Sequence, residues 1–164
     1  MELLETTLCY LERDGRYLML HRVKKAKDVN KDKWIGVGGK LEPGETALAC
    51  AVREVREETG YTMTAPRYRG MVDFYNPPWP AERMHLYTCG EFTGQEHPCD
   101  EGDLAWVEKE RVPDLPVWQG DKIFLALLAK GAPFFHLALH YAGDTLTRAV
   151  LDGRELPPDG GTEG

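Results

Sequence analysis

Three glutamates, Glu54, Glu57 and Glu58, stand at spacings that place them on one face of a helix. Residues three and four apart on a helix are neighbours, so these like charges repel one another and weaken the helix. A divalent cation relieves that repulsion, because Mg²⁺ binds carboxylates and keeps several waters and substrate phosphate oxygens. The three side chains therefore predict a metal site, although a glutamate-rich helix on its own is more often a solvated face.

A glycine-rich segment, residues 34–44 (WIGVGGKLEPG), directly precedes this helix. Gly36, Gly38 and Gly39 let backbone groups approach an ion closely because they carry no side chain. The segment is not a Walker A loop, since leucine follows Gly39 and Lys40 where that motif needs serine or threonine. Its position next to the glutamates favours a metal site over a solvated helix face.

An arginine and a further glutamate flank the three carboxylates. Arg53 stands four residues before Glu57, and we expect it to orient that glutamate as part of the catalytic group. Glu45 precedes the helix, and we expect it to reach back toward an arginine or the helix N-terminus. Glu45 is therefore predicted to support the metal ligands from outside the metal site.

The hydrophobic pattern around these residues predicts mixed strands with two helices. Thr46 is a good N-cap for a helix over residues 47–59, and Gly60 suits the position after its end. Its core-facing stripe is predicted to be Leu48, Ala51, Val52, Val55 and Thr59. A second helix is expected over residues 121–130.

Two hairpins are expected, one with strands 6–11 and 17–21 around Asp14-Gly15 and one with strands 134–141 and 146–151 around Gly143-Asp144. Further strands are expected at residues 68–75, 85–92 and 104–107. The fold class is therefore α+β or an α/β sandwich. Residues 1–152 are predicted to form one domain, followed by a disordered tail over residues 153–164.

Composition narrows the function classes. The chain has 164 residues, with 20 Lys and Arg against 27 Asp and Glu, a net charge of −7. This charge repels polyanions and disfavours a nucleic-acid polymer as partner, but it permits a small phosphorylated substrate held by a metal. No apolar run approaches the roughly 20 residues needed to span a membrane. No secretory signal is expected, and the spacing of the four cysteines matches no zinc pattern. We therefore expect a cytoplasmic protein with reduced thiols. It is expected to be a monomer or a homodimer.

The chemistry-bearing residues resemble a known motif. Gly39, Glu45 and the run Arg53–Tyr61 (REVREETGY) are similar to the Nudix box, G-x5-E-x7-R-E-U-x-E-E-x-G-U. The resemblance implies hydrolysis of a nucleoside diphosphate linked to another moiety. It also implies the Nudix fold, in which a mixed β-sheet lies in an α/β/α sandwich.

The same resemblance implies a set of metal ligands for Mg²⁺ or Mn²⁺. By position in the motif, Glu57 and Glu58 are the best ligands, and Glu54 is either a ligand or the base that activates water. The Gly38 carbonyl is implied as a further ligand. Glu101 lies where the family often places a loop glutamate that joins the metal site, or it is one more charge in an acidic stretch.

Similarity outside the box points to a subgroup. Segments from about residue 6 to residue 151 resemble the MutT/MutX-type 8-oxo-dGTP diphosphatases. This implies that Arg22 and Lys40 meet the substrate phosphates and that Trp118 and Asp121 bind the base. Phe74 and Trp79 are implied to line the same pocket. Guanidinium suits phosphate, and an indole face suits a purine.

Other functions stay open at this stage. The same chemistry could act on ADP-ribose, a dinucleoside polyphosphate, a capped RNA end or another nucleoside triphosphate. Ile35 stands where vertebrate-type relatives place an asparagine that contacts the purine, which leaves the choice of base undecided. A non-catalytic nucleotide-binding module is the third alternative, but such a protein would be expected to lose the glutamates that this chain keeps.

Overall fold

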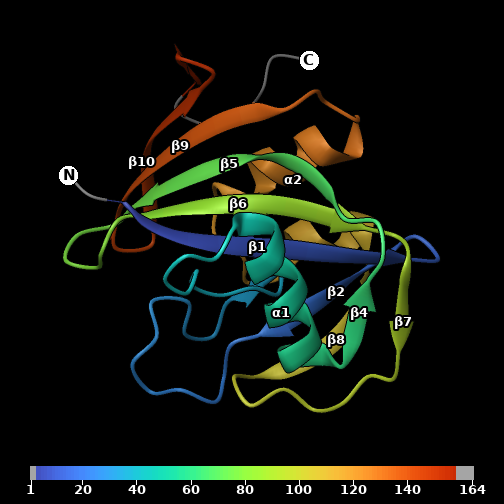
Figure 1. Cartoon of the computed structure of the whole chain (residues 1–164). Helices are drawn as coiled ribbons and strands as arrows, with labels where there is room; N and C mark the ends of the chain where they lie inside the picture. Colours follow the sequence, from blue (N-terminus) through green and yellow to red (C-terminus); the bar gives the residue numbers. More distant parts are fainter. Residues whose placement is uncertain (1–2, 158–164) are drawn as a thin grey trace.

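The computed structural model describes residues 3–157 and shows a twisted mixed sheet between two helices (Figure 1). In the described part the main sheet runs in the order β11 (Arg154–Glu155), β10 (Thr145–Leu151), β9 (Phe135–Ala142), β5 (Arg67–Tyr75), β6 (Glu82–Cys89), β1 (Leu4–Arg13), β2 (Arg16–His21) and β3 (Trp34–Ile35), with β8 (Asp103–Glu108) also paired to β2. β1 pairs with β6 and β5 with β9 in parallel, and the other pairs are antiparallel. β4 (Tyr61–Met63) and β7 (Phe92–Gly94) form a separate antiparallel pair.

The helices α1 (Ala47–Thr59) and α2 (Asp121–Ala129) lie on opposite faces of the sheet (Figure 1), and a short 3-10 helix, η1 (Lys109–Asp114), follows β8. Alternate residues of a strand point to opposite faces. Accordingly, Leu8 and Tyr10 of β1 join the core under α2, while Cys9 and Leu11 join the core under α1. The predicted α/β/α arrangement with a mixed sheet is confirmed.

The pairing of β1 explains where a cleft can open. β1 and β2 pair only next to their turn, at Glu12 with Tyr17 and at Arg13 with Arg16. Toward its start, β1 instead pairs with the glycine-rich segment, through bridges of Cys9 with Val37 and of Thr6 with Lys40. The glycine-rich segment, which directly precedes α1, therefore lies against the first half of β1.

The ends of α1 are as predicted. The Ala49 amide donates to the Thr46 hydroxyl oxygen at 3.1 Å, and Gly60 adopts the left-handed conformation with φ of 89°. The predicted inward stripe was wrong at Leu48, which is 50% exposed. The helix is turned so that Cys50 and Glu58 are buried as well, because this side packs against the glycine-rich segment.

Two other predictions need correction. The strand expected over residues 85–92 ends at Cys89, and the chain turns at Gly90 to form β7 against β4. The tail expected to be disordered after residue 152 begins with β11, which pairs with β10 through a turn at Asp152 and Gly153, both with positive φ. Asp-Gly is a hairpin signal, so this strand was readable from the sequence. Residues 158–164 of the predicted tail lie outside the described residues.

The four cysteines are buried and free of disulfide bonds. Among residues 3–157, no helix is long and apolar enough to cross a membrane.

Candidate active site

A cleft of about 760 Å³ runs between the glycine-rich segment, the start of β1, the loop after β2 and the start of β6. Its walls carry three of the predicted carboxylates, Glu54, Glu58 and Glu101. The cleft is also lined by Thr6, Arg22, Lys25, Val29, Asn30, Ile35, Gly38, Gly39, Lys40, Arg53, Trp79, Glu82 and Met84. Such a volume is typical of small-molecule sites.

The glycine-rich segment is fixed tightly to β1. The Thr7 amide donates to the Gly39 carbonyl at 2.9 Å, and a side chain at Gly38 would collide with the Thr7 carbonyl. A β-carbon at Gly39 would lie 2.5 Å from the carboxyl carbon of Glu54. Glycine is required at both positions because the backbone passes close to β1 on one side and to a carboxylate on the other.

Arg53 links the carboxylates of this region. Its guanidinium binds both oxygens of Glu45, through Nε and Nη2 at 2.8 Å each, and contacts Glu54 at 2.7 Å and Glu57 at 3.3 Å. It also donates to the Lys40 carbonyl at 3.2 Å. The bonds from Arg53 lower the pKa of Glu45 to about 2, with help from the Glu42 amide, which keeps that carboxylate charged.

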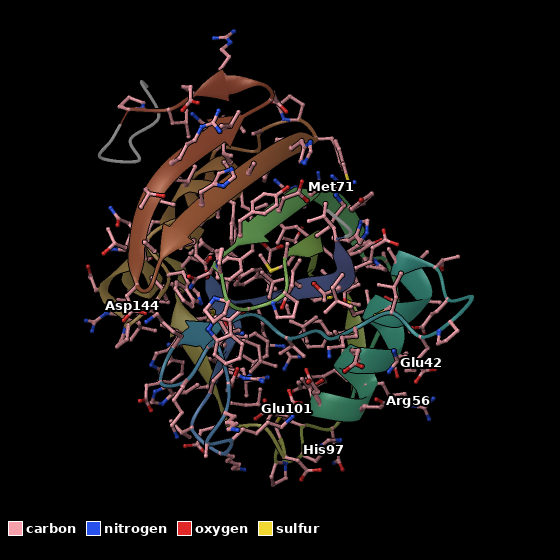
Figure 2. The ribbon with its side chains drawn as sticks, turned by 90° about the vertical axis from the view of Figure 1, so that its left-hand side faces the viewer. Glu42, Arg56, Met71, His97, Glu101 and Asp144 are labelled. Atoms are coloured by element: carbon pink, nitrogen blue, oxygen red, sulfur yellow. The ribbon has the colours of Figure 1, made fainter. Side chains whose placement is uncertain are left out.

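Two neighbouring carboxyl groups, the buried Glu58 and the half-buried Glu101, belong to the acidic wall. Glu58 is 8% exposed and accepts a bond from the Gly38 amide at 3.2 Å. Burial raises its pKa, and the neighbouring carboxyl of Glu101 adds to the effect. Burial also acts on Glu101, but its bonds with Glu58 and Lys25 and the charge of Arg22 outweigh it and lower its pKa. Figure 2 shows Glu101 beside the end of α1, although it comes from the loop before β8.

Glu57 lies apart from the other box glutamates. Its side chain is 60% exposed, and it borders a shallow groove on the outer side of α1 with Leu48 and Val52 instead of the cleft. Within residues 3–157, no three His, Cys, Asp or Glu side chains converge in the geometry of a metal cluster. Even so, Glu54, Glu58 and Glu101 supply carboxylate oxygens on one wall, and this donor set suits a hard cation such as Mg²⁺.

Positive side chains face the same cleft. Arg22 donates through Nε to Asp28 at 2.7 Å and through Nη1 to Glu101, and Lys25 contacts Glu101 at 2.9 Å. Lys40 also lines the cleft. Negative and positive groups are therefore interleaved where phosphates would be held.

The three residues predicted to bind the base are brought together, but beneath the surface. Trp118 is 4% exposed, Asp121 4% and Phe74 6%, and none of them lines the cleft. The rings of Trp118 and Phe74 pack edge to face at 5.1 Å, and the Trp118 indole donates to the Asn30 side chain at 2.7 Å. The loop after β2 thus holds the indole from the cleft side through Asn30.

The burial of Asp121 has a marked electrostatic consequence. Its carboxyl group is taken out of water almost completely, which raises its pKa to about 8, and the charge of Lys33 only partly opposes this. Asp121 also raises the pKa of the buried Tyr10 hydroxyl, after burial itself. At neutral pH the folded protein holds Asp121 mainly as a neutral acid.

Sequence reasoning missed several residues that line the cleft on the side away from α1. They are Asn30 and Val29 of the loop after β2, and Glu82 and Met84 of β6. Trp79 of the loop before β6, which the resemblance places at the base pocket, does line this side of the cleft. The place of Glu82 and Met84 depends on the parallel pairing of β6 with β1, which no local pattern reveals.

Comparison with known proteins decides the family. Residues 3–128 match the NUDIX domain family. The chain belongs to the Nudix family. The resemblance of its glycine-rich segment and α1 to the Nudix box is confirmed, and the chain is a Nudix hydrolase of MutT type.

Relatives with named activities are spread over different substrates. The oxidized purine nucleoside triphosphate hydrolase of Danio rerio is 25% identical, over 89% of this chain and 92% of its own. The CTP pyrophosphohydrolase of Escherichia coli is 29% identical, over 79% and 96%. The crystal structure of the MutT protein of Bacillus halodurans superposes with a TM-score of 0.79 and 26% identity, over 92% and 98%. The two curated relatives are named for different substrates, so the comparisons do not decide the substrate of this chain.

Proposed function

We propose that this Nudix hydrolase cleaves nucleoside triphosphates to the monophosphate and pyrophosphate, and that oxidised purine nucleotides such as 8-oxo-dGTP are its preferred substrates. The observation that carries the proposal is the acidic wall of the cleft. There Glu54, Glu58 and Glu101 line the same cleft as Arg22 and Lys40, and Arg22 contacts Glu101 directly. A wall of carboxylates among cations suits a polyphosphate that arrives with a divalent metal.

Glu54, Glu58 and Glu101 would hold Mg²⁺ or Mn²⁺ together with the Gly38 carbonyl, and Glu57 would act from the edge of the site. When bound, the metal neutralises phosphate charge and lowers the pKa of an attacking water. Arg22 and Lys40 bind the phosphate oxygens, and the planar guanidinium of Arg22 offers several donors to them.

Glu54 is our candidate for the group that accepts the proton of the attacking water. It lies against Gly39 and accepts a 2.7 Å bond from Arg53, which fixes the direction of its carboxylate. A positioned carboxylate of this kind contributes to catalysis as a general base. Arg53 and Glu45 hold it in place without contacting the substrate.

The choice of oxidised purines rests on the similarity to the Danio rerio hydrolase and on the size of the cleft. In this role the protein would remove damaged nucleotides from the cytoplasmic pool before they enter DNA. The similarity to the Escherichia coli enzyme makes CTP the second candidate.

The test is pyrophosphate release in the presence of Mg²⁺ from 8-oxo-dGTP, dGTP, 2-oxo-dATP, CTP and ADP-ribose, compared by kcat/KM. We expect 8-oxo-dGTP to exceed dGTP by about a hundredfold, which corresponds to roughly 2.7 kcal/mol in the transition state. If CTP had the highest kcat/KM, the assignment as a triphosphate hydrolase would stand and the preference for oxidised purines would fail. A lead for ADP-ribose would overturn the triphosphate assignment.

A further inference from the structure

We propose that Glu82 recognises the base of the substrate, and that it favours a guanine-type base, which carries a 2-amino group next to N1–H. The proposal rests on the proposed function, because it assigns the base side of the same cleft. It differs from the assignment by resemblance, in which Asp121 reads the base.

The position of Glu82 follows from strand pairing. Lys40 pairs with Thr6 of β1, and β1 pairs in parallel with β6, which begins at Glu82. Thr6 lies opposite Met84, and Glu82 lies opposite Leu4, two residues earlier on β6. With adjacent strands about 4.8 Å apart and a rise of about 3.3 Å per residue, the backbone of Glu82 is roughly 12 Å from that of Lys40. A ribose that joins a base near Glu82 to phosphates near Lys40 can span this separation.

The carboxylate of Glu82 has capacity for further hydrogen bonds. Its one hydrogen bond is with the Thr6 hydroxyl, which donates to Oε2 at 3.4 Å. Among residues 3–157, it has no ion-pair partner within 4 Å, unlike Glu54 and Glu101 on the opposite wall. Burial raises its pKa, and the Thr6 hydroxyl and the charges of Lys40 and Arg22 oppose this only in part.

A half-buried carboxylate with free lone pairs is stabilised by a ligand that donates to it. The two oxygens of a carboxylate accept two parallel donors, as they do from arginine. Guanine and 8-oxoguanine both present N1–H beside the 2-amino group, which matches this geometry. Adenine and cytosine instead place an amino group beside a ring nitrogen with a lone pair, which would face the second oxygen and repel it.

The surroundings of Glu82 suit a flat base. Val29, Ile35 and Met84 line this part of the cleft with apolar surface, and Trp79, which is 42% exposed, stands at the edge. A base between these side chains would bury its two weakly hydrated faces against apolar surface. A single polar group would then orient its edge. Asp121 is buried and does not line the cleft.

The test compares dGTP with dITP, which differs only by lacking the 2-amino group. We expect the wild type to favour dGTP by about tenfold or more in kcat/KM, since a hydrogen bond to a charged group is at stake. Glu82→Gln should bring the two substrates to within about threefold, because the amide offers only one acceptor oxygen. The matched control is Glu110→Gln, an exposed glutamate of η1 outside the cleft, which should keep the wild-type ratio.

Equilibrium binding of dGMP and dIMP, measured by calorimetry on the same three proteins, separates this proposal from the proposed function. If the wild type hydrolyses no triphosphate but binds dGMP more tightly than dIMP, and Glu82→Gln removes the difference, the proposed function fails and the role of Glu82 stands. An unchanged preference in Glu82→Gln, or an equal loss for every base, would overturn the role of Glu82.

Discussion

The two walls of the cleft are built on different principles. On the α1 side, Glu54 and Glu101 are each held by an arginine, and Glu58 is buried against the glycine-rich segment. On the β6 side the wall is largely apolar, with Ile35 and Met84, and its few polar groups have spare hydrogen-bonding capacity. The first wall fixes charges where phosphates react, whatever base is attached, so the second wall is left to set the choice of substrate.

Removing a carboxylate from the acidic wall is expected to have the largest effect. Glu58→Gln should lower kcat by about a thousandfold or more for every substrate, because it removes a charged oxygen donor from the metal site. Glu57→Gln is the comparison, and we expect a smaller loss because that side chain is 60% exposed outside the cleft. Thermal unfolding should show both variants folded. An equal loss in both would contradict the division between these two glutamates.

Removing the arginine that connects the acidic wall should have the next largest effect. Arg53→Ala should reduce kcat by about 10- to 100-fold, since groups that orient metal ligands have effects of this size. Arg56→Ala, three residues away on the exposed side of α1, is the matched control and should stay near wild type. Similar kinetics for the two variants would show that Arg53 does not position the carboxylates.

The raised pKa of the buried Asp121 predicts how the stability of the protein depends on pH. The pKa of Asp121 is about 8 in the folded protein and 3.8 in the reference state, so the folded protein binds an extra proton between these values. Its contribution to stability is therefore full below about pH 4 and is lost as the pH rises toward 8. Asp121→Asn should flatten this decline and add on the order of a few kcal/mol at pH 8 relative to wild type. Urea unfolding from pH 5 to pH 9 measures it, and parallel curves for both proteins would contradict it.

The smallest effect is expected from a substitution of Trp118, whose indole is bonded to Asn30 in the loop after β2. Trp118→Phe keeps the packing against Phe74 but removes the bond to Asn30, at a cost of about 1 kcal/mol. We expect KM for purine triphosphates to rise a few-fold while kcat is kept, because the loop borders the base side of the cleft. A fall in kcat with unchanged KM would place Trp118 with the catalytic wall instead.

The same contrast explains what could be predicted from the sequence. Two of the three carboxylates of the acidic wall, Glu54 and Glu58, are brought together by helical spacing alone, whereas Glu101 comes from the loop before β8. The base side joins β6, the loop after β2 and the glycine-rich segment, and its members depend on strand pairing across the chain. Trp118, Asp121 and Phe74 were predicted to meet the base, but nothing local showed that the chain would bury them.

The incorrect predictions for α1, β6 and the segment after β10 also come from contacts between distant parts of the chain. The exposure of Leu48 follows from packing of Cys50 and Glu58 against a distant segment, which overrides the hydrophobic stripe of α1. The break at Gly90 and the hairpin at Asp152-Gly153 were local signals of ordinary strength, and only the pairing partners β4 and β10 make them decisive.

The division of the cleft is tested most directly by one kinetic comparison. The values of kcat and KM are measured with Mg²⁺ for dGTP, dITP, dATP and dCTP in wild type, Glu58→Gln and Glu82→Gln. The account predicts that Glu58→Gln lowers kcat by a similar factor for all four substrates and keeps their order of preference. It predicts that Glu82→Gln changes the order and removes the lead of dGTP. If Glu58→Gln altered the order, or if Glu82→Gln lowered kcat equally for all four, the two walls would not have separate roles.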